Sequence, residues 1–286
     1  MTTGLPLEVR SFEELISRFD YDATRALQIR ELGVVRRDGA LIQDLRYESL
    51  SGGQIEAYWV TPEGGQSYPV VIYLHPAPGS RGTYLEEAAA LAGQGAASLL
   101  IEAPWAQMES FGPVVADPHR ALETFTLFVK DLRRGIDLAA GRPGVDASRI
   151  GLVGHSLGAY MGGILAGVEK RLRAVVLISV TGRLGDVAAV NMPDLEPQVM
   201  DHYRQVIAPV DPVYYVGHAA PTTLFYQFGT QDDFYPHESF TAIASAGSQP
   251  KRVEWYETNH WFEHHGARQD RMAWLAEQLK AGRLHD

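Results

Sequence analysis

The sequence contains no cysteine, so several kinds of chemistry are excluded at the outset. Disulfide bridges, thiolate zinc sites and a cysteine nucleophile are all ruled out. Long apolar runs are also missing, since the longest aliphatic stretch, residues 174–180, is far too short to span a bilayer. Residues 1–10 lack the apolar core of a signal peptide. We therefore expect a cytoplasmic protein with no membrane span.

Positive charge is scarce as well, because 25 Lys and Arg stand against 35 Asp and Glu, for a formal net charge of -10. A surface this acidic repels phosphate backbones, so nucleic acid is not an expected partner. The remaining composition is ordinary for a soluble globular protein. A chain of 286 residues can bury a sizeable core.

Strand patterns dominate the first part of the chain. Ser11 and Glu14 fit a capping box, so residues 1–42 are interpreted as an N-terminal helical segment. Three strand-like stretches follow: 43–49, 54–61 and 69–74. Their connections are too short for crossover helices, so we expect these strands to pair antiparallel.

Strands and helices alternate through the rest of the chain. Asp117 is a candidate N-cap and Pro118 a first-turn proline for a long amphipathic helix. The other predicted helices are 84–92, 157–168, 199–207, 239–246 and 267–280. The predicted strands are 97–102, which is expected to be buried, 149–154, 174–180, 222–228 and 252–256. This order predicts an α/β domain over residues 43–286, with a mostly parallel sheet, helices on both faces and an insertion at about 183–218.

The strongest chemical signal is the sequence Gly-His-Ser-Leu-Gly at 154–158. A predicted strand runs directly into it and a predicted helix runs directly out, which is the setting of a nucleophile elbow. Side chains two residues on either side of Ser156 would collide, which explains Gly154 and Gly158. Ser156 is therefore the candidate nucleophile, and the alternative is a Gly-Ser turn without chemistry.

A serine hydroxyl needs a base to take its proton, and His260 is the candidate. It follows the last predicted strand, where a loop would bring it over Ser156. His264 lies four residues further along, but no third ligand is evident, so no metal site is expected. His264 and His265 are interpreted as solvated.

An acid should hold the imidazole in the tautomer that accepts the serine proton. The loop after the predicted strand 222–228 carries two carboxylates, Asp232 and Asp233. We favour Asp232, and Asp233 is the alternative. Asp211, in an Asp-Pro setting that suits a turn, is a third candidate.

Acyl transfer places negative charge on a carbonyl oxygen, which requires fixed N–H donors. Leu157, directly after the nucleophile, should supply one backbone N–H. The second should come from the His-Pro-Ala-Pro-Gly loop at 75–79, where the prolines cannot donate and Ala77 can. His75 is expected to hold this loop by a hydrogen bond. The alternative for the loop is a rigid proline turn.

Taken together, these motifs resemble the α/β-hydrolase superfamily. The Asp-x-x-Arg-Ile-Gly lead-in at 146–151 is similar to that of dienelactone-hydrolase-like and prolyl-oligopeptidase-like esterases. The loop at 75–79 resembles the family's His-Gly-x-Pro oxyanion loop, with Pro76 in place of glycine. Residues 229–232 and 259–262 resemble its acid and histidine loops.

The resemblance covers roughly residues 43 to 280 and implies an α/β-hydrolase fold. It also implies ester hydrolysis through an acyl-enzyme, without a cofactor. Dienelactone hydrolases proper use a cysteine nucleophile, so the resemblance does not extend to that activity.

Ligand sites in open α/β sheets lie beyond the carboxyl ends of the strands. We expect several aromatic and apolar side chains to line a substrate pocket there: Tyr84, Trp105, Met108, Tyr214 or Tyr215, Phe234 and Trp261. Such a lining would suit apolar acyl or aryl groups. The alternative for each residue is packing in the core.

These residues favour a carboxylesterase that acts on a small-molecule ester. The same three catalytic residues would serve a peptidase or amidase, or a cofactor-free acyltransferase or perhydrolase. A non-catalytic ligand-binding protein on the same fold could also retain them.

Overall fold

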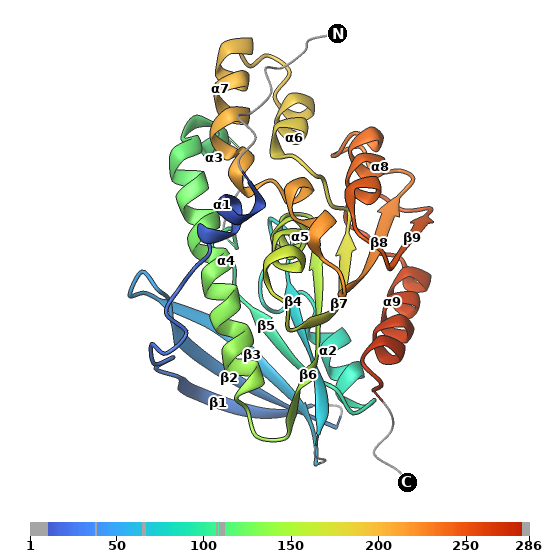
Figure 1. Ribbon diagram of the computed structural model, residues 1–286. Coiled ribbons are helices and arrows are strands. Elements are labelled where there is room, and N and C mark those ends of the chain that lie inside the picture. The colour runs from blue at the N-terminus through green and yellow to red at the C-terminus, as the bar shows by residue number, and fades with distance from the viewer. Residues whose placement is uncertain (1–10, 38, 65–66, 107, 109–111, 282–286) are drawn as a thin grey trace.

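The computed structural model describes residues 11–281 except 38, 65–66, 107 and 109–111. The signal-peptide prediction concerns residues 1–10 and therefore lies outside the described residues. In the described part, one sheet of nine strands has the order β1-β2-β3-β5-β4-β6-β7-β8-β9 (Figure 1). The strands are β1 (Arg30–Arg37), β2 (Ala40–Glu48), β3 (Gln54–Pro62), β4 (Tyr68–Leu74), β5 (Ala97–Ile101), β6 (Val145–His155), β7 (Leu172–Ile178), β8 (Thr223–Gly229) and β9 (Lys251–Tyr256).

The sheet begins antiparallel and continues parallel, which confirms the predicted fold class. β2 pairs antiparallel with β3. In the part of the sheet with the order β5-β4-β6-β7-β8-β9, every pair of neighbouring strands is parallel. The predicted pairing of the second and third strand-like stretches is wrong, because β5 lies between β3 and β4. A short connection sets the relative direction of two strands, but it does not make them neighbours in the sheet.

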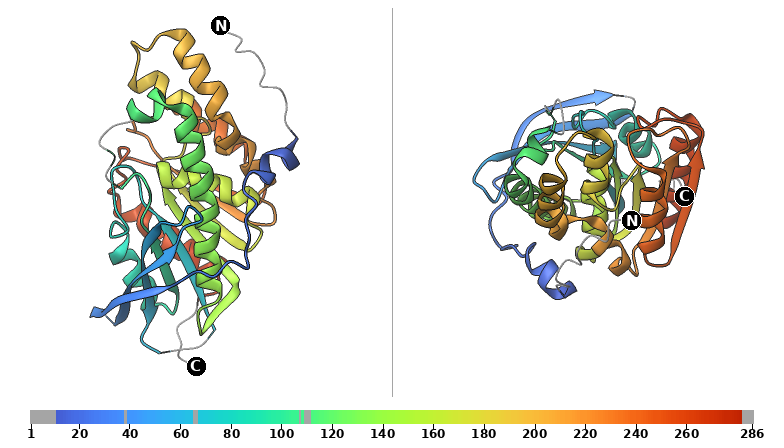
Figure 2. Two further views of the ribbon diagram at one scale, coloured as in Figure 1. Left: turned by 90° about the vertical axis from the view of Figure 1, so that its left-hand side faces the viewer. Right: turned by 90° about the horizontal axis from the view of Figure 1, so that it is seen from above.

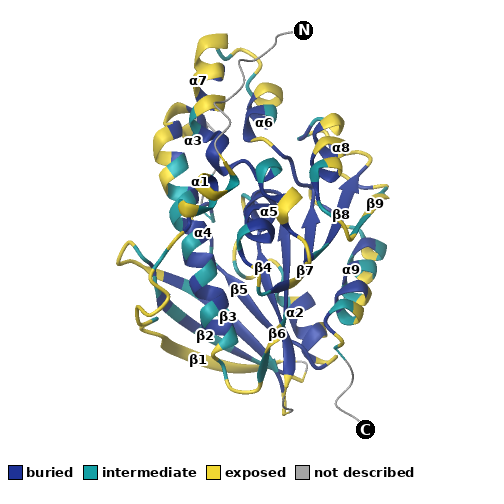
Figure 3. Ribbon diagram, in the orientation of Figure 1, coloured by how far each residue is buried: buried dark blue, intermediate teal, exposed yellow. Residues whose placement is uncertain are grey.

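A further strand occupies part of the segment that we interpreted as helical. Within the described residues of 1–42, helix α1 spans only Phe12–Ser17, and Ser11 and Glu14 form the predicted capping box there. β1 follows and pairs antiparallel with β2 at the sheet edge. Both faces of β1 are exposed (Figure 3), so it lacks the alternation of apolar and polar residues that reveals a strand.

Helices cover both faces of the sheet (Figures 1 and 2). α4 and α5 pack in one apolar cluster, and α2 and α9 pack in a second one on the opposite face. Consecutive residues of β4 alternate between these clusters, since Ile72 joins the first and Val71 and Tyr73 the second. The helices are α2 (Leu85–Ala92), α3 (Gly112–Ala116), α4 (Pro118–Ala140), α5 (Leu157–Val168), α6 (Leu184–Asn191), α7 (Pro197–Ile207), α8 (His237–Ala246) and α9 (His265–Gln278). None of the helices in these described ranges is long and apolar enough to cross a membrane.

The predicted caps and the insertion region have clear structural counterparts. The Asp117 side chain accepts a hydrogen bond from the Arg120 N–H at the start of α4, as an N-cap does. Residues 183–218 contain α6, α7 and three short 3-10 turns. α6 and α7 extend beyond the end of the sheet (Figure 1). α6 was not expected from the sequence.

Arg134 ties the N-terminal segment to α4. Its fully buried guanidinium donates to the carbonyl oxygens of Arg25 at 3.1 Å, Ala26 at 3.0 Å and Glu48 at 3.2 Å. These carbonyls belong to the chain before β1 and to the end of β2, so one side chain fixes both against the helix.

Replacing this guanidinium should destabilise the protein. We expect Arg134→Met to lower the free energy of unfolding by about 3 kcal/mol, because buried carbonyl groups would lose their donors. Chemical denaturation would measure the loss. Arg120→Met, at an exposed position of the same helix, is the matched control and should change stability little. Equal effects of the two substitutions would contradict this role of Arg134.

Candidate active site

The turn at Ser156 joins β6 directly to α5. Ser156 has a positive φ of 53° and a ψ of -119°, a backbone conformation that side chains rarely adopt. A Cβ atom on Gly154 would lie 2.5 Å from the carbonyl oxygen of Gly158, and one on Gly158 would overlap the carbonyl oxygen of Leu74. The predicted steric reason for both glycines is therefore correct.

Ser156, His260 and Asp232 form a continuous line of hydrogen bonds at the carboxyl ends of β6, β9 and β8. The Ser156 hydroxyl donates to His260 Nε2 at 2.9 Å, and His260 Nδ1–H donates to Asp232 Oδ2 at 2.8 Å. All three side chains are buried. Low exposure strengthens these contacts and keeps the imidazole in one orientation.

The surroundings of Asp232 keep its carboxyl group ionised. Burial is the largest single effect and raises its pKa, but the hydrogen bond from His260, the charge of His260 and the hydrogen bond from the Tyr235 N–H together outweigh it, so the pKa of Asp232 lies below its usual value. Asp232 Oδ1 also accepts the backbone N–H groups of Phe234 at 3.1 Å and Tyr235 at 3.2 Å. A carboxylate held in this way can stabilise an imidazolium.

The two alternative acids lie elsewhere. Asp233 is exposed, and no contact joins it to His260 in the described residues. Asp211 is buried and accepts the Tyr160 hydroxyl at 2.5 Å and the Leu184 N–H at 3.1 Å. Burial raises the pKa of Asp211 to about 7. Asp211 thus connects the nucleophile helix α5 to α6.

His155 links the nucleophile turn to the backbone of His260. Its Nε2–H donates to the His260 carbonyl oxygen at 2.7 Å. Burial lowers the pKa of His155 to about 3, so its ring stays neutral. The residue before the nucleophile therefore fixes the main chain of the base.

The two candidate oxyanion donors lie on neighbouring segments. Leu157 is the first residue of α5, where backbone N–H groups have no partner within the helix. His75 Nδ1–H donates to the Pro76 carbonyl at 2.7 Å, and His75 Nε2 accepts the Ala103 N–H at 3.0 Å. The predicted structural role of His75 is confirmed. In the described residues the Ala77 N–H has no acceptor.

Tyr235 is a residue that the sequence reasoning missed. Its hydroxyl lies 3.1 Å from Ser156 Oγ, and its ring packs edge-on against His260 with ring centroids 4.7 Å apart. Burial raises the pKa of Tyr235 far above neutrality, so it keeps its proton. The sequence signal for this residue is its place three residues after Asp232, in the loop that carries the candidate acids.

Two of the predicted pocket residues lie beside His260. The ring centroid of Phe234 is 4.8 Å from that of His260, and the ring centroid of Trp261 is 6.0 Å away. Met108 and Tyr214 are partly buried against the larger core cluster. Tyr215, the alternative to Tyr214, is fully buried.

Trp105 packs in the core instead of lining an open pocket. It is 3% exposed, donates from Nε1 to the His75 carbonyl at 3.2 Å and lies edge-on against Phe125 and Phe128. This matches the alternative of core packing. This hydrogen bond holds the His75 carbonyl group, at the start of the loop at 75–79, against the core.

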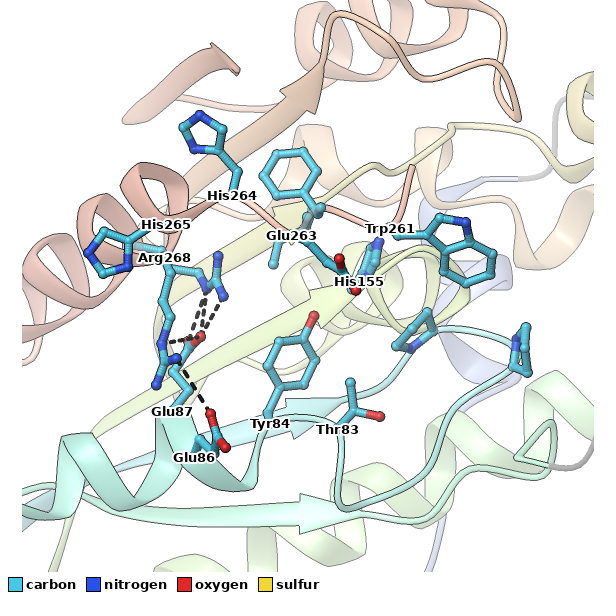
Figure 4. A pocket seen from close by; sticks show the side chains of 15 residues that line it. Thr83, Tyr84, Glu86, Glu87, His155, Trp261, Glu263, His264, His265 and Arg268 are labelled. Atoms are coloured by element: carbon cyan, nitrogen blue, oxygen red, sulfur yellow. Dashed lines mark hydrogen bonds and ion pairs between the residues drawn. The ribbon is translucent and has the colours of Figure 1, made fainter. Parts of the chain in front are cut away.

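Tyr84 and Trp261 line a cavity of about 490 Å³ between α2 and α9 (Figure 4). Its lining residues come from both helices and from the loops on either side of the nucleophile turn: Pro76, Pro78, Thr83, Tyr84, Glu86, Glu87, His155, Ile178, Trp261, Phe262, Glu263, His264, His265, Arg268 and Arg271. The cavity adjoins the three hydrogen-bonded residues but is not lined by them.

The described residues hold no group of three or more His, Asp or Glu side chains that could bind a metal ion. His264 is not simply solvated, because its Nδ1 accepts the Ala267 N–H at 3.1 Å and caps α9. His265 is exposed.

No protein-family model matches the sequence, and no curated protein matches it. Solved structures do resemble the fold. The acetyl xylan esterase 1 of Thermoanaerobacterium sp. has a TM-score of 0.78 at 17% identity, over 93% of this chain and 93% of that one. The acetyl xylan esterase of Paenibacillus sp. R4 has a TM-score of 0.77 at 20% identity, over 93% and 92%.

An alpha/beta hydrolase from Penicillium sp. sh18 has a TM-score of 0.63 at 14% identity, over 84% of this chain and 99% of that one. Identities this low inform on architecture alone. Together with the strand order and the turn at Ser156, they show that this chain has the α/β-hydrolase fold.

Proposed function

We propose that this protein is a serine hydrolase that cleaves carboxylic esters through an acyl-enzyme. The observation that carries the proposal is the unbroken hydrogen-bond line from Ser156 through His260 to Asp232. A buried base that already accepts the hydroxyl proton, and is itself oriented by a carboxylate, is the arrangement that activates serine.

The reaction proceeds in two stages. His260 takes the Ser156 proton as Oγ attacks the ester carbonyl, and the backbone N–H groups of Leu157 and Ala77 stabilise the resulting oxyanion. The protonated His260 then gives its proton to the leaving alcohol, and the acyl group stays on Oγ. In the second stage His260 takes a proton from a water molecule as that water attacks the acyl carbonyl. The bond to Oγ then breaks, the acid leaves, and His260 returns the proton to Ser156 Oγ.

The comparisons support an ester substrate over an amide. Two of the similar structures are acetyl xylan esterases by their titles, at 17% and 20% identity. Their activity is not carried over as such, but it favours testing esters with short acyl groups first.

Removing the nucleophile should abolish hydrolysis. We expect Ser156→Ala to lower kcat on p-nitrophenyl acetate by about 10⁶-fold, with binding largely retained. An active-site-directed fluorophosphonate followed by peptide mapping should label Ser156. A residual rate within tenfold of wild type, or labelling at another residue, would reject the assignment.

The two neighbouring aspartates provide a matched comparison. Asp232→Asn should lower kcat on the order of 10³- to 10⁴-fold, because the amide no longer fixes the imidazole tautomer. Asp233→Asn, at the exposed position, should change kcat less than twofold. Steady-state kinetics of both variants would show which aspartate is the catalytic acid partner of His260. A larger loss of kcat in Asp233→Asn than in Asp232→Asn would identify Asp233 instead.

Tyr235 should contribute through its hydroxyl. The Ser156 hydroxyl proton points to His260, so Tyr235 donates to Oγ and stabilises negative charge there. A hydrogen bond to a charged group contributes about 1.5–3 kcal/mol, so Tyr235→Phe should lower kcat about 10- to 100-fold and leave KM near its original value.

Tyr226→Phe is the control for this substitution, because the Tyr226 hydroxyl is buried without a partner in the described residues. If both variants retained wild-type kcat, Tyr235 would be a packing residue only.

A further inference from the structure

The strand β9 forms an open edge of the sheet. It pairs parallel with β8 along its whole length, and within the described ranges no other strand pairs with it (Figure 1). Two large apolar side chains on this strand are exposed, Val253 at 37% and Trp255 at 41%. An open strand with exposed apolar side chains can pair with a strand of another chain.

The backbone groups that face this open edge follow from the hydrogen bonds on the other side of β9. The Tyr256 carbonyl oxygen accepts the Thr230 N–H, directly after β8. Because the residues of a strand turn their N–H and C=O groups alternately to its two sides, Lys251, Val253 and Trp255 turn theirs to the open edge. No described loop or helix contributes a backbone hydrogen bond to Val253 or Trp255.

The opposite edge strand, β1, is less suited to pairing with another chain. Its ladder with β2 is irregular between Glu31 and Gly33, and it carries Arg30, Arg36 and Arg37. Bulges and an excess of like charges are features with which natural sheets protect their edges. The ladder of β9 is unbroken, and the arginine of this strand is balanced by a glutamate.

A second copy of β9 fits this edge in one antiparallel register. When a two-fold axis relates two antiparallel strands, one residue lies opposite its own copy on the axis. With Val253 on the axis, Arg252 lies opposite Glu254 of the second copy, and Glu254 lies opposite Arg252. Moving the axis by one residue would place Arg252 opposite Arg252 or Glu254 opposite Glu254, and like charges in these positions repel.

This register also matches the two kinds of position in an antiparallel ladder. Val253 turns its N–H and C=O groups outward, so it and its copy can exchange two hydrogen bonds. Arg252 and Glu254 then form the pairs without backbone hydrogen bonds, in which the side chains of the two strands lie closest. Within one chain Arg252 Nε already donates to Glu254 Oε1 at 3.0 Å. Two copies therefore bring together four charges of alternating sign.

The charges and the apolar groups have different roles in this interface. The Arg252 and Glu254 side chains are 41% and 42% exposed, and ion pairs this accessible add little affinity. They select the register, because the other registers bring like charges together. Backbone hydrogen bonds and the exposed faces of Val253 and Trp255 supply the stabilisation.

We propose that two copies of this chain associate through β9, paired antiparallel about a two-fold axis at Val253, so that their sheets become continuous. The inference does not depend on the proposed ester hydrolysis. It does concern the same part of the molecule, because the loop that carries His260 follows β9 directly. The pairing would fix the strand from which this loop extends.

Sedimentation equilibrium of the wild-type protein at about 1 to 100 µM tests the association. We expect a monomer–dimer equilibrium with a dissociation constant in the micromolar range, because an interface built on one short strand is small. The melting temperature should rise with protein concentration over the same range, since association stabilises the folded chain. A protein that stays monomeric at every concentration would overturn the proposal.

Charge reversal tests the register. Arg252→Glu and Glu254→Arg should each raise the dissociation constant at least about 10-fold, because two pairs of like charges replace two pairs of opposite charges. The double variant Arg252→Glu/Glu254→Arg should dimerise with nearly the wild-type affinity. A mixture of the two single variants should form a heterodimer, because every arginine then lies opposite a glutamate. A merely structural role of either residue would not produce this rescue.

Arg36→Glu is the matched control, since it reverses an exposed charge on the other edge strand. It should leave the dissociation constant within about twofold of wild type. If Arg36→Glu dissociates the dimer and the β9 variants do not, the copies pair through another edge and the proposal is wrong. The register is also wrong if the double variant and the mixture stay monomeric while circular dichroism shows that each protein is folded.

Discussion

The close approach of three backbone segments at Ser156 is the constraint on which the rest of this molecule depends. The end of β6, the first turn of α5 and the end of β4 meet so tightly that only glycine fits at positions 154 and 158. This contact forces Ser156 to a positive φ and lifts its side chain off the sheet. It also places the first N–H groups of α5 beside the loop at 75–79. The nucleophile and both proposed oxyanion donors are therefore set by a single packing contact.

The sheet order brings the other groups to the same place. β6, β8 and β9 run parallel, so the loops after them emerge at one edge and deliver Ser156, Asp232 and His260 together. Ser156 and His260 are 104 residues apart in the sequence, and the hydrogen bonds among the three groups exist only when this part of the sheet is assembled. The alignment of Ser156, His260 and Asp232 therefore depends on the correct assembly of the parallel strands.

The sequence predicted the features that depend on local pattern. Three features have a clear periodicity or turn residues in the sequence and form as expected: the turn at Ser156, the long helix that begins after Asp117, and the strands that alternate with helices. The sequence could not predict which strands are neighbours in the sheet. β5 lies between β3 and β4 because of tertiary contacts, and no local sequence pattern encodes those contacts. β1 was missed because both its faces are exposed. Tyr235 was missed because its role comes from tertiary proximity to Ser156, and a tyrosine in a loop has no signature of its own. Trp105, predicted at the pocket, is held in the core by its hydrogen bond to the loop at 75–79.

The hydrogen bond from His155 to the backbone of His260 has a consequence for how the molecule works. The segment after β9 is anchored in its middle by this bond and at its far end by His264, which caps α9. A base held at two points has little freedom to swing away from the serine. Its alignment is built during folding and requires no closing motion when substrate arrives. Fixing the orientation of His260 costs conformational free energy only once, when the chain folds. Substrate binding therefore does not have to supply that free energy in each turnover.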